Sequence, residues 1–181
     1  NWSKLDRLPP NASKKAEGHL WSAPIPDGID NFRVMYNNGV MHQRAKGEKW
    51  SPVPPPPVSE VRQSDSRNVY YNKDRYRLRM IEYTGDELRA WENPSDIEVV
   101  FNPVLWNMMI IPLESVDTEN KVGWLKFEAN SQAGTKDPHH APAFVYIENA
   151  IDFLDEPGEW CVNTMEGKIY YWPVDDEPGE D

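Results

Sequence analysis

The sequence predicts an all-β protein, most simply a β-sandwich of about eight to ten short strands with long Pro-rich loops and at most one or two short helices. Proline accounts for 17 of 181 residues and glycine for 10, which favours turns over long helices. Eight Trp and eight Tyr indicate extensive aromatic burial, an aromatic binding surface, or both. Short alternating or β-branched runs recur along the chain, as in strands.

The first strands are expected in a hairpin. The preceding thirty residues contain four prolines and predict extended, turn-rich backbone. Residues 32–36 and 40–44 predict two strands joined at Asn37-Asn38-Gly39, because Asn-Gly suits a type I′ turn, which needs positive φ at both central residues.

A second strand region follows at residues 75–83. There Arg75, Arg77 and Arg79 alternate with apolar or aromatic residues, which predicts a half-buried strand with a basic outer face. Residues 84–91 predict one short helical turn with acidic residues near its start.

The second half of the chain predicts a series of buried strands and one hairpin. The apolar runs contain β-branched and aromatic residues, and a short helix is expected at 150–154. The expected strands are 97–101, 104–111, 122–128, 143–149, 159–162 and 168–172, the last two forming the hairpin.

We interpret residues 1–181 as a single β-rich domain and as a fragment of a larger protein. Within it, residues 52–68 predict a Pro-rich and polar loop, and residues 174–181 an acidic tail. The N-terminal residues contain no apolar signal core, which is expected of a mature chain or an excised piece.

Charge and composition exclude several classes of protein. The net charge of −11 argues against a nucleic-acid binder, which needs a basic surface to displace counterions from phosphates. No apolar stretch is long enough for membrane insertion as a helix. Cys161 is the single cysteine, so an intrachain disulfide is impossible.

Three stretches, in this order, carry a family resemblance. The first is residues 32–39 followed by Arg44-Ala45-Lys46, and the second is residues 94–101 followed by Trp106. The third, which is the most specific, comprises residues 147–150, residues 153–160 (FLDEPGEW) and residues 169–173 (IYYWP).

Together these stretches resemble the β-rich inserted domain of bacterial right-handed parallel β-helix glycoside hydrolases of the α-L-fucosidase/xylanase type. The resemblance extends from about Trp2 to about Pro173. Two departures are visible: Lys46 stands where the family usually has a second Arg, and Cys161-Val162-Asn163 replaces Tyr-Leu-Asp. The resemblance implies a parent enzyme whose β-helix and catalytic carboxylates lie outside these residues.

No residue of the chain is therefore expected to be catalytic. Glycoside hydrolysis needs two carboxyl groups about 5–10 Å apart, and Asp155, Glu156 and Glu159 are close in sequence. We interpret them as part of a turn, because Pro157-Gly158 suits a tight reversal. No metal site and no cofactor are expected, since adjacent His139 and His140 are poorly spaced for one ion.

Carbohydrate binding by stacking is the favoured ligand chemistry, because sugar rings have apolar faces that lie well on aromatic rings. Most of the tryptophans are nevertheless expected in the core, at least half of them buried. An arginine face could attract an acidic glycan or could contact an acidic neighbour, including the acidic half of this chain. The candidates are Trp50, Trp91, Trp106, Arg75, Arg77 and Arg79.

The leading hypothesis is a non-catalytic β domain of a secreted, periplasmic or cell-surface bacterial enzyme that degrades glycans. Its expected partners are the β-helix catalytic region of the same parent protein, which it would brace and whose substrate cleft it could line, and a polysaccharide or oligosaccharide. The alternative is an independent carbohydrate-binding module. A third reading is a small self-sufficient glycosidase that uses Glu156 or Glu159.

Overall fold

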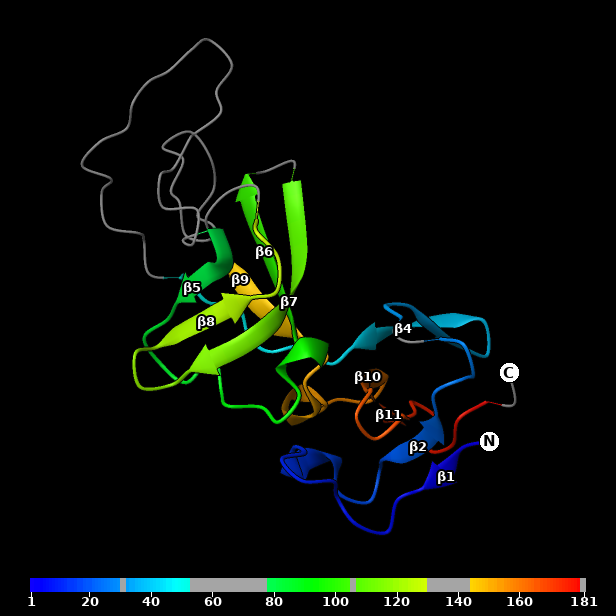
Figure 1. Cartoon of the computed structure of the whole chain (residues 1–181). Helices are drawn as coiled ribbons and strands as arrows, with labels where there is room; N and C mark the ends of the chain where they lie inside the picture. The colour runs from blue at the N-terminus through cyan, green and yellow to red at the C-terminus, as the bar shows by residue number, and fades with distance from the viewer. Residues whose placement is uncertain (30–31, 53–77, 105–106, 130–143, 180–181) are drawn as a thin grey trace, which may run out of the picture. The chain divides into compact units, whose positions relative to one another are not determined.

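The computed structural model describes residues 1–29, 32–52, 78–104, 107–129 and 144–179 (Figure 1). These residues form eleven short strands in two sheets, and their helical elements are short 3-10 turns. The all-β prediction is confirmed, and the two sheets are consistent with the predicted β-sandwich class. The 3-10 turns with fully described bounds are η1 (Lys14–Ala16), η3 (Pro94–Asp96) and η4 (Ile151–Phe153), the last within the predicted helix at 150–154.

One sheet has six strands in the order β1-β2-β11-β10-β4-β3. Neighbouring strands are antiparallel except β4 and β10, which run parallel through a short register at Gln43–Glu159 and Arg44–Trp160. The strands are β1 (Ser3–Lys4), β2 (Trp21–Pro24), β3 (Met35–Asn37), β4 (Val40–Arg44), β10 (Glu159–Asn163) and β11 (Lys168–Tyr171).

The β3–β4 hairpin forms where it was predicted. Asn37 pairs with Val40 across a two-residue turn. Asn38 and Gly39 have φ values of 52° and 72°, so both central residues adopt the positive φ that a type I′ turn requires. The hairpin is therefore specified by local sequence.

Strands β10 and β11 are buried on both faces of the six-stranded sheet, which explains their apolar and aromatic sequence. Alternate residues supply two separate clusters, as the twofold period of a strand requires. One contains Ala16, Leu20, Ala45, Leu154, Cys161 and Tyr170, and the other Trp160, Val162, Ile169 and Tyr171.

The other sheet has five strands in the order β5-β8-β7-β6-β9. Strand β7 extends beyond the predicted end at Ile111 because it accommodates Pro112. The Pro112 carbonyl accepts the Lys126 N–H at 2.8 Å. A register shift follows between Leu113 and Ser115. The strands are β5 (Met80–Glu82), β6 (Glu98–Val104), β7 (Asn107–Asp117), β8 (Val122–Leu125) and β9 (Val145–Glu148).

The helical turn predicted over residues 84–91 is wrong, because the structure has bends there. Leu88 is nevertheless buried, and its Cδ1 atom lies 2.5 Å from the position a Cβ would take on Gly123. Residue 88 thus packs against β8 as part of a loop, and a side chain at position 123 would require Leu88 to move.

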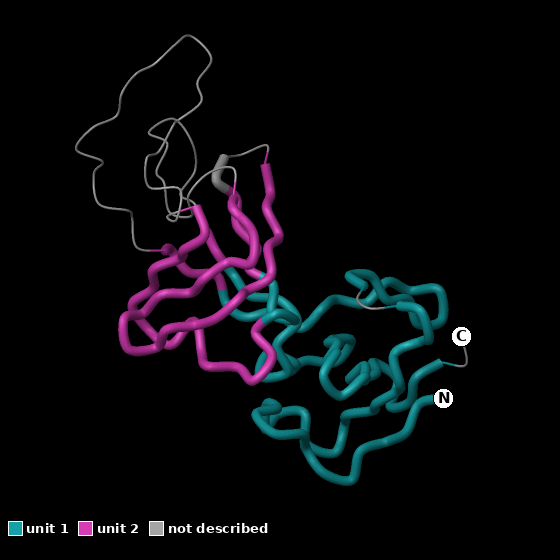
Figure 2. Tube along the Cα trace, in the orientation of Figure 1, with its two compact units in different colours: residues 1–48, 95–98, 146–181 teal, residues 49–94, 99–145 magenta. Residues whose placement is uncertain are grey.

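Contacts divide the chain into two compact units (Figure 2). Unit 1 comprises residues 1–48, 95–98 and 146–181, and unit 2 comprises residues 49–94 and 99–145. Unit 1 holds the whole six-stranded sheet, whereas β6 and β9 each begin in one unit and end in the other. The description of the chain as a single domain stays a prediction.

Two predicted segments lie partly outside the described residues. Of the loop at 52–68 only Pro52 is described, and of the acidic tail residues 174–179. The described part of the tail is held by two hydrogen bonds, from the Trp21 indole N–H to the Asp176 carbonyl at 3.1 Å and from the Gly179 N–H to Asn37 Oδ1 at 2.6 Å.

Candidate functional site

A buried ion cluster lies at the start of β6 in unit 1. Glu98 is fully buried, Arg44 is 4% exposed, and both Arg33 and Arg44 pair with the Glu98 carboxylate. The Arg33 Nε atom lies 3.0 Å from each carboxylate oxygen. Burial raises the pKa of Glu98, but the hydrogen bonds and charges of Arg33 and Arg44 outweigh burial and leave that pKa below its ordinary value.

The guanidinium of Arg44 also contacts an aromatic ring. Its Cζ atom lies 5.5 Å from the ring centroid of Trp160, and Phe32 stacks on Trp160 at 5.1 Å with an interplanar angle of 11°. The Trp160 indole N–H donates to the His42 carbonyl at 3.1 Å. The charged cluster is therefore built into the aromatic core of the sheet.

The backbone that follows Arg44 connects two other segments of unit 1. The Ala45 N–H donates to the Trp160 carbonyl at 2.8 Å, and the Ala45 carbonyl accepts the Asn149 N–H at 2.9 Å. The Gly47 N–H donates to the Ile147 carbonyl at 2.9 Å. Lys46 is exposed and donates to Gln43 at 2.8 Å.

Asn149 is buried and adopts a positive φ of 69°. Its side chain accepts the Val162 N–H at 2.8 Å and donates to the carbonyls of Val162 and Asp96 at 3.0 and 2.9 Å. The Asp96 carboxylate in turn accepts the backbone N–H of Thr164 at 2.7 Å and its hydroxyl at 2.8 Å. The side chains of Asn149 and Asp96 thus form hydrogen bonds with backbone groups that are not paired by a neighbouring strand.

Glu159 organises the turn that precedes β10. One carboxylate oxygen accepts the N–H groups of Asp155 and Glu156 at 2.9 and 3.2 Å, and the other accepts from the Gln43 side chain at 3.2 Å. Burial raises the pKa of Glu159 above its ordinary value, although these donors act in the opposite direction. Gly158 closes the turn with a φ of 89°.

All three motif stretches therefore contribute to a set of buried polar groups in unit 1, which we call the polar centre. The first supplies Arg44, the second Asp96 and Glu98, and the third Asn149 and Glu159. Each polar side chain serves a backbone group or an opposite charge, so the arrangement holds segments together. Within the described ranges, no group of three or more His, Cys, Asp and Glu is arranged to hold a metal ion.

The signals for this centre were present in the sequence but were not recognised as a site. Glu98 is a single acid within the apolar run IEVVF, which is unusual for a buried strand unless a cation partners it. The sequence does not reveal that Arg33 and Arg44 are those cations, because they are more than fifty positions away.

The structure describes three of the six carbohydrate-binding candidates, and all three lie in unit 2. Trp50 is half-buried, exchanges two backbone hydrogen bonds with Val145 at 2.8 and 2.9 Å, and has an indole nitrogen without a partner among the described residues. Trp91 is also half-buried. The remaining candidates, Trp106, Arg75 and Arg77, lie outside the described residues.

Arg79 does not extend a described strand: it lies in a 3-10 turn just before β5. It donates to the Leu125 carbonyl at 3.1 Å and to Glu114 at 2.5 Å. Glu114 belongs to the acidic half of the chain, so Arg79 is paired within its own chain.

The expectation that at least half of the tryptophans are buried is wrong for the part of the chain that the structure describes. Trp160 is buried there, and Trp2, Trp21, Trp50, Trp91, Trp124 and Trp172 are half-buried. Most of these large side chains are therefore partly exposed, as their size favours.

A family model described as "GH141 insertion domain" matches residues 18–174, which include all the residues of the polar centre. The chain belongs to this family. The GH141 insertion domain is also similar to a solved structure titled "Glycoside hydrolase", with 21% sequence identity and a TM-score of 0.56. That similarity covers 100% of this chain but 29% of the other, so the chain spans less than a third of its structural relative. No curated protein matches the chain.

The range matched by the GH141 insertion domain model contains all three motif stretches. The matched range includes Arg44, Asp96, Glu98, Asn149 and Glu159, and the geometry gives each a structural contact. These motif residues thus serve the folding of unit 1, as do Trp160, Tyr170, Tyr171 and Trp172, which belong to or pack on its buried clusters.

Proposed function

We propose that the chain is a non-catalytic β domain of a secreted bacterial glycan-degrading enzyme, that it braces a catalytic β-helix, and that it lines the substrate cleft. Two facts support a role as an accessory part. The family is an insertion domain by description, and the structural relative titled "Glycoside hydrolase" continues well beyond the 29% that this chain covers. The expected partners are the β-helix region of the parent chain and its polysaccharide or oligosaccharide substrate.

The observation that carries the proposal is the attachment of both terminal segments to one sheet of unit 1. Trp2 packs on Tyr171 of β11 with centroids 5.6 Å apart, and β1 pairs with β2. At the other end, the Trp21 indole of β2 holds the Asp176 carbonyl. Figure 1 shows the first and the last described residues on the same side of unit 1, as expected when a host chain enters and leaves an inserted domain at one place.

The use of the acidic residues supports a non-catalytic role. Glu159 is occupied by two backbone N–H groups and Gln43, and Asp155 pairs with Lys15 at 2.6 Å. Glycoside hydrolysis by two carboxyl groups needs one free to protonate the leaving oxygen and another to face the sugar. The Glu159 carboxyl group, which lies within the most specific motif, is instead engaged in shaping a turn.

The proposed location outside the cytoplasm rests on the proposed substrate, because the enzyme must be where the polysaccharide that it degrades is present. Among the described residues, no helix has the length and apolar character needed to cross a membrane.

Purified residues 1–181 test the role directly. We expect no hydrolysis of a panel of aryl-glycosides and no retention on a glycan array. Turnover that is lost in Glu156→Gln or Glu159→Gln would support the small-glycosidase reading instead. Glycan retention that is lost in Trp50→Ala or Trp91→Ala would support the independent carbohydrate-binding module. The matched control is Trp172→Phe, which alters a half-buried ring of unit 1 outside the proposed ligand surface.

A further inference from the structure

The β3–β4 hairpin presents an unusual apolar surface. Four of its large side chains are more than half exposed: Val34 at 53%, Tyr36 at 60%, Val40 at 58% and Met41 at 63%. The chain is 27% charged, yet residues 34–43 contain no Asp, Glu, Lys or Arg. Depletion of charge together with aromatic residues and Met is typical of the centre of a protein interface.

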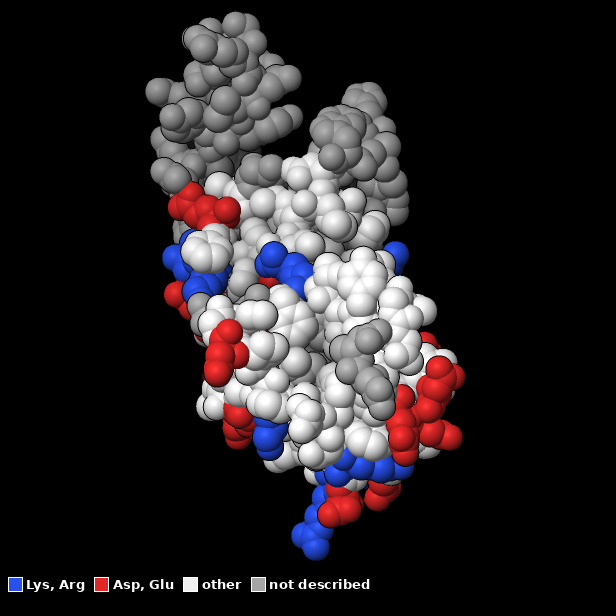
Figure 3. Space-filling model, turned by 90° about the vertical axis from the view of Figure 1, so that its right-hand side faces the viewer, with Lys and Arg blue, Asp and Glu red and all other residues white. Residues whose placement is uncertain are grey.

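Two of these side chains share one face of the hairpin, and a third, Val34, lies just before β3. Tyr36 pairs directly with Met41, and Val34 lies two positions from Tyr36. Figure 3 turns toward the viewer the side on which the hairpin lies in Figure 1, and it shows a broad uncharged area there. Exposure of such an apolar face to water is unfavourable in free energy, and such faces commonly bind a partner that covers them.

The hairpin also forms the edge of its sheet. Strand β3 is the last in the order of the six-stranded sheet. In a two-residue hairpin the pair beside the turn, here Asn37 and Val40, exchanges hydrogen bonds, and the next pair, Tyr36 and Met41, does not. The backbone N–H and C=O of Tyr36 therefore point away from β4, where a further strand or loop can pair with them.

We propose that the β3–β4 hairpin is the surface through which this insertion domain docks on the catalytic region of its own parent chain. The inference rests on the proposed function and names its contact surface. The C-terminal segment supports this occupant, because the Gly179 N–H donates to Asn37 Oδ1 at 2.6 Å at the end of β3. Host sequence that continues from this segment starts beside the hairpin, so its local concentration there is high.

The chemistry of the surface fits a protein better than a sugar. Of the four exposed side chains only Tyr36 carries a polar group, whereas a glycan site needs several polar partners for hydroxyl groups. A second copy of this chain is the other candidate partner for the same face. Dimerisation can be distinguished from docking within one parent chain because the extent of dimerisation depends on protein concentration.

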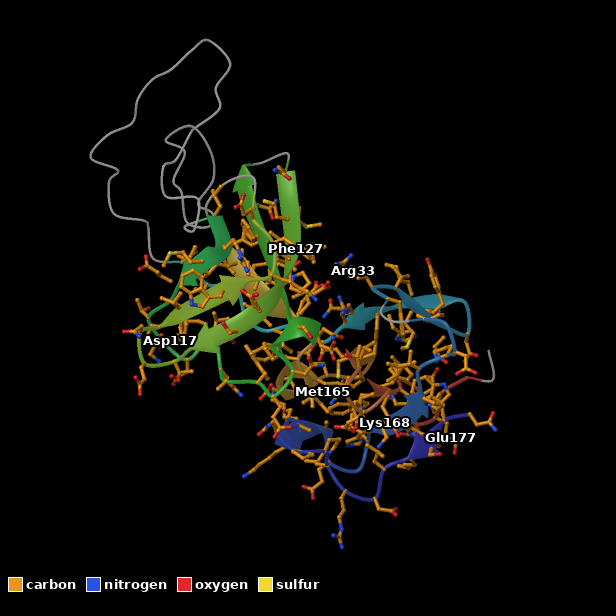
Figure 4. The ribbon with its side chains drawn as sticks, viewed as in Figure 1. Arg33, Asp117, Phe127, Met165, Lys168 and Glu177 are labelled. Atoms are coloured by element: carbon orange, nitrogen blue, oxygen red, sulfur yellow. The ribbon has the colours of Figure 1, made fainter. Side chains whose placement is uncertain are left out.

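The test uses the full-length parent enzyme in four forms: unaltered, with residues 1–181 replaced by a short Gly-Ser linker, with the double substitution Tyr36→Ser/Met41→Ser, and with Met165→Ser. Met165 is 66% exposed on the β10–β11 turn of unit 1 (Figure 4) and is the matched control. The readout is the half-life of activity at a fixed elevated temperature. The isolated chain with each substitution is unfolded in parallel to confirm that it folds normally.

We expect the double variant to lose most of the gain in half-life that the domain gives, and Met165→Ser to retain it. The isolated chain should unfold at nearly the same temperature in both variants, because the altered side chains are exposed. In trans, the isolated chain should bind the linker form of the parent, and the double substitution should weaken binding about tenfold or more.

Each contrary result has its own meaning. If the linker form is less stable than the unaltered enzyme but the double variant is not, the docking surface is wrong and the bracing function stands. If the linker form is as stable as the unaltered enzyme, both are wrong. Concentration-dependent dimerisation of the isolated chain, or glycan binding, that is abolished by Tyr36→Ser/Met41→Ser would also overturn the docking proposal.

Discussion

The side-chain amide of Asn149 pairs with the backbone of Val162 in both directions. Its Oδ1 atom accepts the Val162 N–H at 2.8 Å, and its Nδ2 atom donates to the Val162 carbonyl at 3.0 Å. The amide thus takes the place of a neighbouring strand beside β10, beyond the point where the short β4–β10 pairing ends at Trp160. A third bond, to the Asp96 carbonyl, ties η3 to the same position.

Replacing Asn149 should destabilise the chain strongly. Asn149→Ala leaves buried backbone groups of Val162 and Asp96 without partners and places alanine at a φ of 69°, so we expect a loss of about 3 kcal/mol in the free energy of unfolding. Asn149→Asp should cost at least as much near neutral pH, because it removes the donor and buries a charge. Denaturant unfolding measures both, with exposed Asn120→Ala as the control. Equal stability of the Asn149 and Asn120 variants would refute the assignment.

Glu98→Gln tests the buried ion cluster. The substitution removes the negative charge that Arg33 and Arg44 share and leaves Arg44 buried without a counter-charge, which should destabilise by about 3–5 kcal/mol. Glu114→Gln breaks the more exposed pair with Arg79 and should change stability little. Comparable losses in the two variants would show that the Glu98 cluster contributes no more than a surface pair.

The same cluster predicts how stability depends on pH. Because the pKa of Glu98 is lower in the folded protein than the value of about 4.3 expected in the unfolded chain, its stabilising contribution is complete above that value. The contribution is lost as pH falls through the folded pKa. Glu148 and Glu159 have raised pKa values, mainly through burial, and act with the opposite sign; the charge of Glu98 also helps to raise the pKa of Glu148. The difference in unfolding free energy between wild type and Glu98→Gln should therefore shrink on acidification below about pH 4.3; a constant difference contradicts the account.

Cys161 should report global unfolding. Its side chain is 1% exposed in β10, and burial raises the pKa of the thiol far above its ordinary value, so little reactive thiolate forms. Thiol labelling at pH 8 should be slow in the native chain and should become rapid over the same denaturant range as the loss of tryptophan fluorescence. Fast labelling without denaturant would show that β10 is exposed in the native state.

The elements that local sequence determines were the ones that could be predicted. Asn38-Gly39 indicated a turn, and the apolar and aromatic residues of 159–162 and 168–172 indicated a buried hairpin. Strand β1 has two residues, too few for a periodic pattern, so its pairing with β2 was missed. The predicted strand stopped at Ile111, whereas β7 continues through Pro112 to Asp117, because only tertiary pairing determines whether a bulged strand accommodates a proline.

The polar centre was unpredictable for a different reason. Its contacts join residues separated by long stretches of chain, such as Arg44 with Glu98 and Asp96 with Thr164. Single residues suggested burial or a turn, but only the fold determines which polar groups meet. The carbohydrate-binding assignment of Trp50, Trp91, Trp106, Arg75, Arg77 and Arg79 stays a prediction.

Calorimetry of the full-length parent enzyme, with residues 1–181 present and with a short linker in their place, tests the bracing role most directly. The account predicts that the catalytic region unfolds at a lower temperature when the domain is removed, while the purified domain alone hydrolyses no glycoside. An unchanged unfolding temperature of the catalytic region, or hydrolysis by the isolated domain, would contradict it.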